Sequence, residues 1–133
     1  MTDNDSLVPA EWYAYAARDL KAAKALLAGQ DDTLPVAGML LQQAVEKYLK
    51  GYLLSKGWRL VRTHDLSELL KDVLKYAPDF ADFTDTCLWI TDFYFESRYP
   101  IRLTTPIVRA DLEKLFVQAG EMIARLRSRA DTG

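Results

Sequence analysis

The chain has 133 residues and half of them are hydrophobic, so it can bury one sizeable core and has the usual length of a single domain. Its 17 Lys and Arg residues nearly balance its 19 Asp and Glu residues, which excludes a strong overall field toward nucleic acid or an anionic membrane and leaves only a local patch for such binding. The single cysteine, Cys87, excludes an intrachain disulfide and a cysteine-based metal site.

The termini and the apolar runs predict where the protein works. The first six residues are acidic and polar, without the basic start and apolar run of a signal peptide, and no apolar stretch approaches the roughly 18 residues of a membrane span. We therefore expect a cytoplasmic protein without membrane contact. A single domain should occupy residues 1–133, with its core over about 9–127 and flexible ends.

The first predicted helix begins near Pro9, a favoured first-turn residue, and runs to about Ala28, where Gly29 stops it. Helical spacing places Asp19 among apolar residues, so we expect a buried or half-buried carboxylate. The expected apolar face consists of Trp12, Ala16, Leu20, Ala23 and Leu27.

The second predicted helix runs from about Leu34 to Ser55 and ends at Gly57, with apolar residues on one side. We interpret the polar stripe on its other side as a solvated face, because its residues have the spacing of i, i+4 pairs. Phosphate binding through its two lysines is the alternative. The stripe consists of Gln42, Gln43, Glu46, Lys47 and Lys50.

A third, shorter helix is predicted after His64, with Asp65 or Thr63 as its cap and Pro78 beyond its end. His64 is the sole histidine, and at the point where a loop enters a helix we expect it to cap or to form hydrogen bonds.

The fourth helix is predicted over about Phe80 to Ser97, and the fifth from Thr105-Pro106 to roughly Arg127. Five helices with short connections predict an all-α protein, an antiparallel up-and-down bundle of four to five helices. The expected buried positions are Phe80, Phe83, Cys87, Ile90 and Tyr94 in the fourth helix, and Val108, Leu112, Leu115, Ala119, Met122, Ile123 and Leu126 in the fifth.

Arg98 extends the apolar face of the fourth helix as a cation. Because buried charges are tolerable in pairs, we expect Asp19 and Arg98 to meet, directly or through His64 or a tyrosine. Such a pair either fixes helix register or binds a ligand. The sequence contains no glycine-rich phosphate loop, no metal-ligand spacing and no Ser-His-Asp set.

Four segments together resemble the HEPN family, the higher eukaryote and prokaryote nucleotide-binding domains, over about residues 9 to 127. They are Trp12 with Ala16-Ala17-Arg18-Asp19-Leu20, the run Gln42-Gln43-Ala44-Val45-Glu46-Lys47-Tyr48-Leu49-Lys50, then His64-Asp65-Leu66, and Arg98-Tyr99-Pro100.

The resemblance implies a bundle of four or five helices, usually a homodimer, commonly encoded beside a small nucleotidyltransferase with which it forms a toxin–antitoxin-like system. It implies no metal site and no cofactor beyond ATP or GTP as a ligand. It also implies a nucleotide- or partner-binding cleft at Asp19, Glu46, Lys47, Lys50, His64, Arg98 and Tyr99.

Many HEPN proteins are metal-independent ribonucleases, whose signature is an Arg followed after four to six residues by a His late in the bundle. No histidine follows Arg98 here. Arg59 and His64 have the spacing of the signature, but they lie between the second and third helices, where the family's catalytic pair is not found. We therefore assign no catalytic residue and expect a binding module rather than an enzyme. A ribonuclease would use His64 with Arg59, Arg62 or Arg98. A third interpretation is a structural dimer with aromatic residues at its interface.

Overall fold

The computed structural model describes residues 5–98 and 108–130, and of residues 95–98 it describes the backbone alone. No strand occurs among these residues, which confirms the predicted all-α class. The helices are α1 (Pro9–Leu27), η1 (Asp31–Thr33), α2 (Leu34–Ser55), α3 (Leu66–Leu74), η2 (Pro78–Phe83), α4 (Thr84–Arg98) and α5 (Arg109–Ala130), where η marks a 3-10 helix.

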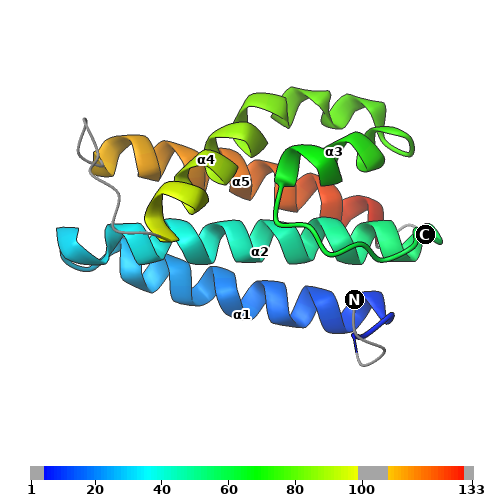
Figure 1. Ribbon diagram of the computed structural model, residues 1–133, viewed down its shortest axis with the longest axis horizontal. Coiled ribbons are helices and arrows are strands. Elements are labelled where there is room, and N and C mark those ends of the chain that lie inside the picture. Colours follow the sequence, from blue (N-terminus) through cyan, green and yellow to red (C-terminus); the bar gives the residue numbers. More distant parts are fainter. Residues whose placement is uncertain (1–4, 99–107, 131–133) are drawn as a thin grey trace.

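Helix α2 is the central element of the bundle. Figure 1 shows α1 and α2 side by side and antiparallel, with α4 and α5 on the opposite side of α2. All four other α-helices contact α2. The predicted antiparallel bundle is therefore confirmed, and α2 is the helix that the four other α-helices share as a neighbour.

Small residues let α1 and α2 approach closely. Ala16 and Ala23 of α1 are fully buried, and a Cβ atom at Gly51 of α2 would lie 2.7 Å from a ring carbon of Tyr13. Only glycine leaves room for that ring, so the packing of the first two helices depends on the absence of a side chain at this position.

The ends of α2 and α3 follow the sequence signals. Gly57 has a φ of 84°, and the amides of Gly57 and Trp58 donate to the carbonyls of Leu54 and Leu53, which satisfies the last turn of α2. The Asp65 carboxylate accepts a hydrogen bond of 2.9 Å from the Ser67 amide, so Asp65 is the cap of α3.

The predicted start of the fourth helix at about Phe80 was wrong, because the first residues of that segment form a different kind of helix. Residues Pro78–Phe83 form a 3-10 helix, and α4 begins at Thr84. In a 3-10 helix the side chains at i and i+3 eclipse one another, so Phe80 and Phe83 both turn into the core, with their ring centroids 5.7 Å apart. All five predicted buried positions of this region are buried.

Helix α5 differs from its prediction at Val108 and at its C-terminal end. Val108 was expected in the core but is 48% exposed, because it lies just before the first helical turn and only its carbonyl takes part in it. The helix continues past Arg127 to Ala130, where Arg125 and Arg129 bind Asp79 of η2. The predicted start at Thr105-Pro106 lies outside the described residues. The other predicted core positions of this helix are buried.

None of the described helices combines the length and apolar character that a membrane span requires.

Candidate functional site

The polar stripe of α2 is buried rather than solvated. Gln42 is fully buried, and Glu46 and Lys50 are 5% and 4% exposed. The expectation of a solvated face was wrong because two other segments cover it. The loop before α3 lies against Gln42 and Glu46 through His64, and Trp12 of α1 lies near Lys50.

Glu46 is the centre of this buried polar group. Its Oε1 atom lies 2.9 Å from His64 Nδ1 and accepts a hydrogen bond of 3.1 Å from Gln42 Nε2. Its Oε2 atom lies 2.9 Å from Lys50 Nζ. Burial of a carboxylate is costly unless a cation and hydrogen-bond donors surround it, and Glu46 has both.

Gln42 joins the centre to the loop. Its Nε2 atom also donates to the His64 carbonyl at 2.7 Å, and its Oε1 atom accepts from Gln43 Nε2 at 3.0 Å. The Gln42 amide thus binds the His64 backbone and also the Glu46 carboxylate that faces the imidazole. The backbone and the side chain of His64 are therefore both held in place.

His64 stands at the solvent edge of the group. Its side chain is 54% exposed, although its Nδ1 atom faces the buried Glu46. The Tyr94 ring lies beside it, with centroids 5.8 Å apart. The imidazole is therefore oriented from the inside and accessible from the outside, which is the arrangement a proton-transfer or ligand-binding histidine requires.

Asp19 is buried, as predicted, and is paired with two cations. Lys47 of α2 donates to its Oδ2 atom, and the Arg18 guanidinium lies 3.6 Å from its Oδ1 atom. The Arg18 side chain is 64% exposed, so one of the two cations faces solvent. Two cations therefore share the one carboxylate of Asp19.

A cleft of about 480 Å³ opens next to Lys47. The Trp12 indole is held in it by a hydrogen bond of 2.8 Å from its Nε1 atom to the Ser6 carbonyl, and the Arg18 guanidinium lies 4.3 Å from the Tyr15 ring centroid. The lining residues are Asp5, Ser6, Glu11, Trp12, Ala14, Tyr15 and Lys47. The cleft therefore combines aromatic rings with one lysine and the carboxylates of Asp5 and Glu11.

The structure groups five of the seven predicted site residues around one side of α2. Glu46, Lys50 and His64 form the buried group, and Asp19 and Lys47 form the pair beside the cleft. Trp12 lies between them, because its ring centroid is 5.8 Å from the Lys50 ammonium and it lines the cleft with Lys47. The Arg98 side chain and Tyr99 lie outside the described residues, so the proposed pairing of Asp19 with Arg98 stays a prediction.

Sequence reasoning missed three contributors: Gln42, Arg18 and Tyr15. Gln42 was expected on the solvated stripe and not in the site, although its i, i+4 spacing to Glu46 is the signal of their hydrogen bond. Arg18 lies on the exposed side of α1, and its pairing with the adjacent Asp19 leaves no periodic signal.

Cysteine and metal chemistry find no support among the described residues. Burial, with a smaller contribution from the charge of Asp65, raises the pKa of the Cys87 thiol to about 12, so it is not a nucleophile near neutral pH. No group of three His, Cys, Asp or Glu side chains in this part of the chain is arranged to hold a metal ion.

Comparison with known proteins identifies relatives of this bundle. A family model described as HEPN domain matches residues 10–129. The crystal structure of TT1696 from Thermus thermophilus has a TM-score of 0.75 at 24% identity and covers 90% of this chain and 96% of its own. The crystal structure of ST0689, an archaeal HEPN homologue, has a TM-score of 0.72 at 25% identity, covering 92% and 97%. No curated protein is significantly similar to the chain.

Proposed function

The chain belongs to the HEPN domain family, and we propose that it is a nucleotide-binding and protein-interaction module of that family. In this proposal it is a homodimer and the partner of a small nucleotidyltransferase in a toxin–antitoxin-like two-component system. The observation that carries the nucleotide half is the pair of cations, Arg18 and Lys47, that share Asp19 beside a cleft lined by aromatic rings.

A nucleotide would meet complementary groups in this cleft. A phosphate group would find two cationic donors here, because the Lys47 ammonium and the Arg18 guanidinium are both held at Asp19. The base can stack on the half-exposed Tyr15 ring, and the Glu11 carboxylate on the lining can accept hydrogen bonds from ribose hydroxyls. ATP and GTP are the candidate ligands.

Calorimetric titration with ATP and GTP, with and without magnesium, tests this half. We expect saturable binding that Lys47→Met weakens at least about tenfold, since a charge-assisted phosphate contact contributes about 1.5–3 kcal/mol. Lys21→Met is the matched control, because Lys21 is an exposed lysine of α1 and does not line the cleft. Absence of binding to either nucleotide, or equal losses in both variants, would overturn it.

The partner half rests on family membership and has its own test. The purified chain is mixed with a small nucleotidyltransferase from the same genome and analysed by size-exclusion chromatography with light scattering. We expect the chain alone to elute as a dimer and the mixture to elute as a larger complex. A monomer at micromolar concentration or separate elution of the two proteins would contradict the corresponding statement.

A metal-independent ribonuclease toxin is the second candidate, favoured by one observation. Glu46 orients the Nδ1 atom of His64 while more than half of the imidazole remains exposed, and a positioned imidazole can transfer a proton to or from an RNA hydroxyl. Incubation of a structured RNA with purified protein tests it. Cleavage that His64→Gln abolishes and Arg127→Gln leaves intact would support this candidate, and intact RNA would remove it.

A further inference from the structure

A stripe of exposed apolar residues with acidic ends runs along α4. Leu88 and Trp89 are 47% and 52% exposed, and Asp85 and Asp92 are exposed on either side of them. The spacing of these four residues is i, i+3, i+4 and i+7, so they lie on one side of the helix. An indole that leaves half of its surface in water, away from the buried polar group, has no role in the core.

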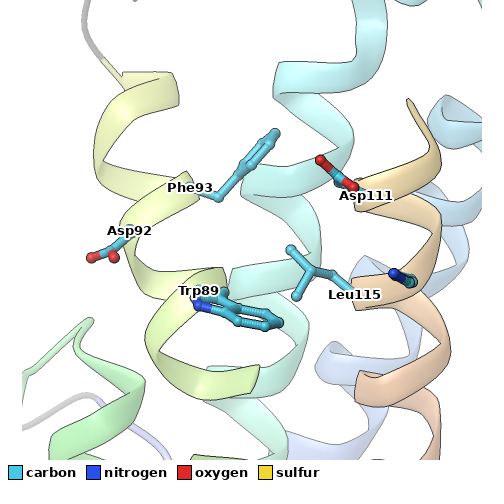
Figure 2. A pocket seen from close by; sticks show the side chains of 6 residues that line it. Trp89, Asp92, Phe93, Asp111 and Leu115 are labelled. Carbon is cyan, nitrogen blue, oxygen red and sulfur yellow. The ribbon is translucent and has the colours of Figure 1, made fainter. Parts of the chain in front are cut away.

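Trp89 forms one wall of a cleft between α4 and α5. At one end the two helices are joined, because Thr86 donates to Gln118 at 3.0 Å and Cys87 lies 3.9 Å from Met122. Toward the other end a cleft of about 420 Å³ opens between them. Figure 2 shows the Trp89 ring and the Leu115 side chain facing each other across it.

The floor of this cleft is built by a close approach of Phe93 to α2. A Cβ atom at Gly38 would lie 2.0 Å from a ring carbon of Phe93, so the ring lies directly on the α2 backbone at the glycine. Without that approach the Phe93 ring would stand farther out and fill the cleft. The cleft is thus shaped by the fold, and its apolar walls are Trp89, Phe93 and Leu115.

The charges around the cleft decide which kind of partner it fits. Asp92 and Asp111 line the cleft, Asp85 ends the stripe, and Lys114 is the one cation among the lining residues that the structure describes. A second copy of the chain docked through this face would set acidic groups against acidic groups, which disfavours association. A segment with Lys or Arg beside an apolar anchor would meet opposite charge.

We propose that the cleft between α4 and α5 is a docking site for a segment of a partner protein that inserts an apolar side chain between Trp89 and Leu115 and places Lys or Arg residues against Asp92 and Asp111. Exposed aromatic side chains of this kind anchor protein contacts, and the surrounding charges set partner choice and association rate. The proposal rests on the partner-binding half of the proposed function and is independent of nucleotide binding.

The test uses two synthetic helical peptides of about 15 residues, because isolated helices shorter than roughly 12–15 residues are only marginally stable in water. Both carry Leu and Trp at i, i+3, i+4 and i+7, and one has Lys and the other Glu on both flanks. Binding is measured by calorimetry and by the shifts of amide resonances in the full-length protein. We expect the Lys peptide to bind, with shifts confined to α4 and α5, more weakly at high salt, and the Glu peptide at least about tenfold more weakly.

Variants of the protein separate the two contributions. Trp89→Ser should weaken the Lys peptide at least about tenfold and, since the side chain is half exposed, should leave the fold intact. The double variant Asp92→Lys and Asp111→Lys should reverse the preference, so that the Glu peptide binds better. Circular dichroism confirms that each variant is folded, and the charge reversal still tests the site if Trp89→Ser does not fold.

Four results would overturn the proposal, and the first three are no binding of the Lys peptide, equal binding of both peptides, and self-association of the chain that Trp89→Ser abolishes. Titration of Trp89→Ser with ATP keeps these failures distinct from those of the proposed function. Unchanged nucleotide binding with lost peptide binding is the expected outcome. A nucleotidyltransferase that still binds Trp89→Ser and the charge-reversed variant with unchanged affinity would refute the docking site while leaving the proposed function in place.

Discussion

Two regions of this bundle reverse the usual distribution of side chains, in opposite senses. Beside α1, the α2 helix buries Glu46 and Lys50, which are charged, whereas α4 exposes Leu88 and Trp89, which are apolar. Buried charges and exposed apolar surface are more informative than an ordinary core or an ordinary surface, because each costs free energy unless something compensates it. The difference between the two regions lies in where that compensation comes from.

The polar group is complete within the fold, and the apolar cleft is not. Glu46 has a cation and two further hydrogen-bond partners within the chain, so ligand contact is left to its edges at His64 and Lys47. At the cleft, Trp89 remains half exposed, and no side chain of the described residues covers it. We therefore expect a ligand to contact the polar group only at its edges, and a partner to contact the cleft at its centre, at Trp89.

Removing the centre of the polar group should have the largest effect. Glu46→Ala leaves Lys50 buried without its partner, and breaking a buried ion pair in this way destabilises a protein by about 3–5 kcal/mol. Urea denaturation measures the loss. The double variant Glu46→Met and Lys50→Met is the control, because replacing both charges by apolar groups is often close to neutral. A cost below about 1 kcal/mol for Glu46→Ala would mean that the pair is more hydrated than its burial indicates.

The second prediction concerns the floor of the cleft. Gly38→Ala places a methyl group 2.0 Å from Phe93, so the ring has to move outward, at a cost of about 1–3 kcal/mol. The displaced ring would also occupy the cleft, and binding of the Lys peptide should fall with stability. Adding Phe93→Leu to Gly38→Ala should restore part of both. Unchanged stability and unchanged peptide binding would contradict the account of how the cleft is shaped.

The sequence predicted the two regions unequally, for a physical reason. Periodicity distinguishes apolar from polar positions, so it located the helices and nearly all of the core. It also assigned Gln42, Glu46 and Lys50 to solvent, because a polar stripe covered by another segment has the same pattern as a solvated one. The error at Val108 has the same origin, since periodicity does not show where a helix begins to pack.

The family resemblance supplied what periodicity could not. It selected Asp19, Glu46, Lys47, Lys50 and His64, and the structure brings these side chains to one side of α2. The Trp89 cleft was not predicted by either route. Its position depends on how far α4 stands from α5 and on the approach of Phe93 to Gly38, and neither distance is encoded in a local pattern.

The third prediction is a matched glycine with the opposite sign. Gly120 lies within α5, and a Cβ atom added there would meet nothing within 4 Å. Gly120→Ala should therefore stabilise the protein by about 0.5–1 kcal/mol, because alanine loses less conformational freedom in a helix than glycine does. Urea denaturation of Gly38→Ala and Gly120→Ala side by side measures both. Destabilisation by Gly120→Ala would show that general strain in the bundle, and not the Phe93 contact, explains the loss of stability in Gly38→Ala.

The smallest effect is expected at a third group of charges, which is exposed and provides the contrast to Glu46. Arg129 holds the pKa of Asp79 below its ordinary value of 3.8, mainly through a side-chain hydrogen bond. A carboxyl group with a lowered folded pKa contributes stability above its ordinary pKa and loses that contribution as the pH falls through the folded value. Arg129 itself has a raised pKa and stays charged throughout this range.

Arg129→Gln should therefore lower the melting temperature slightly at pH 7, and the difference from the wild type should shrink as the pH falls below 3.8. Exposed ion pairs are screened by salt, so the difference should also be smaller at high ionic strength. Arg127→Gln, an exposed arginine near the same end of α5, removes an equal charge and should show neither dependence. If Arg129→Gln lowered stability as much as Glu46→Ala, burial would not be what distinguishes the polar group on α2 from a surface cluster.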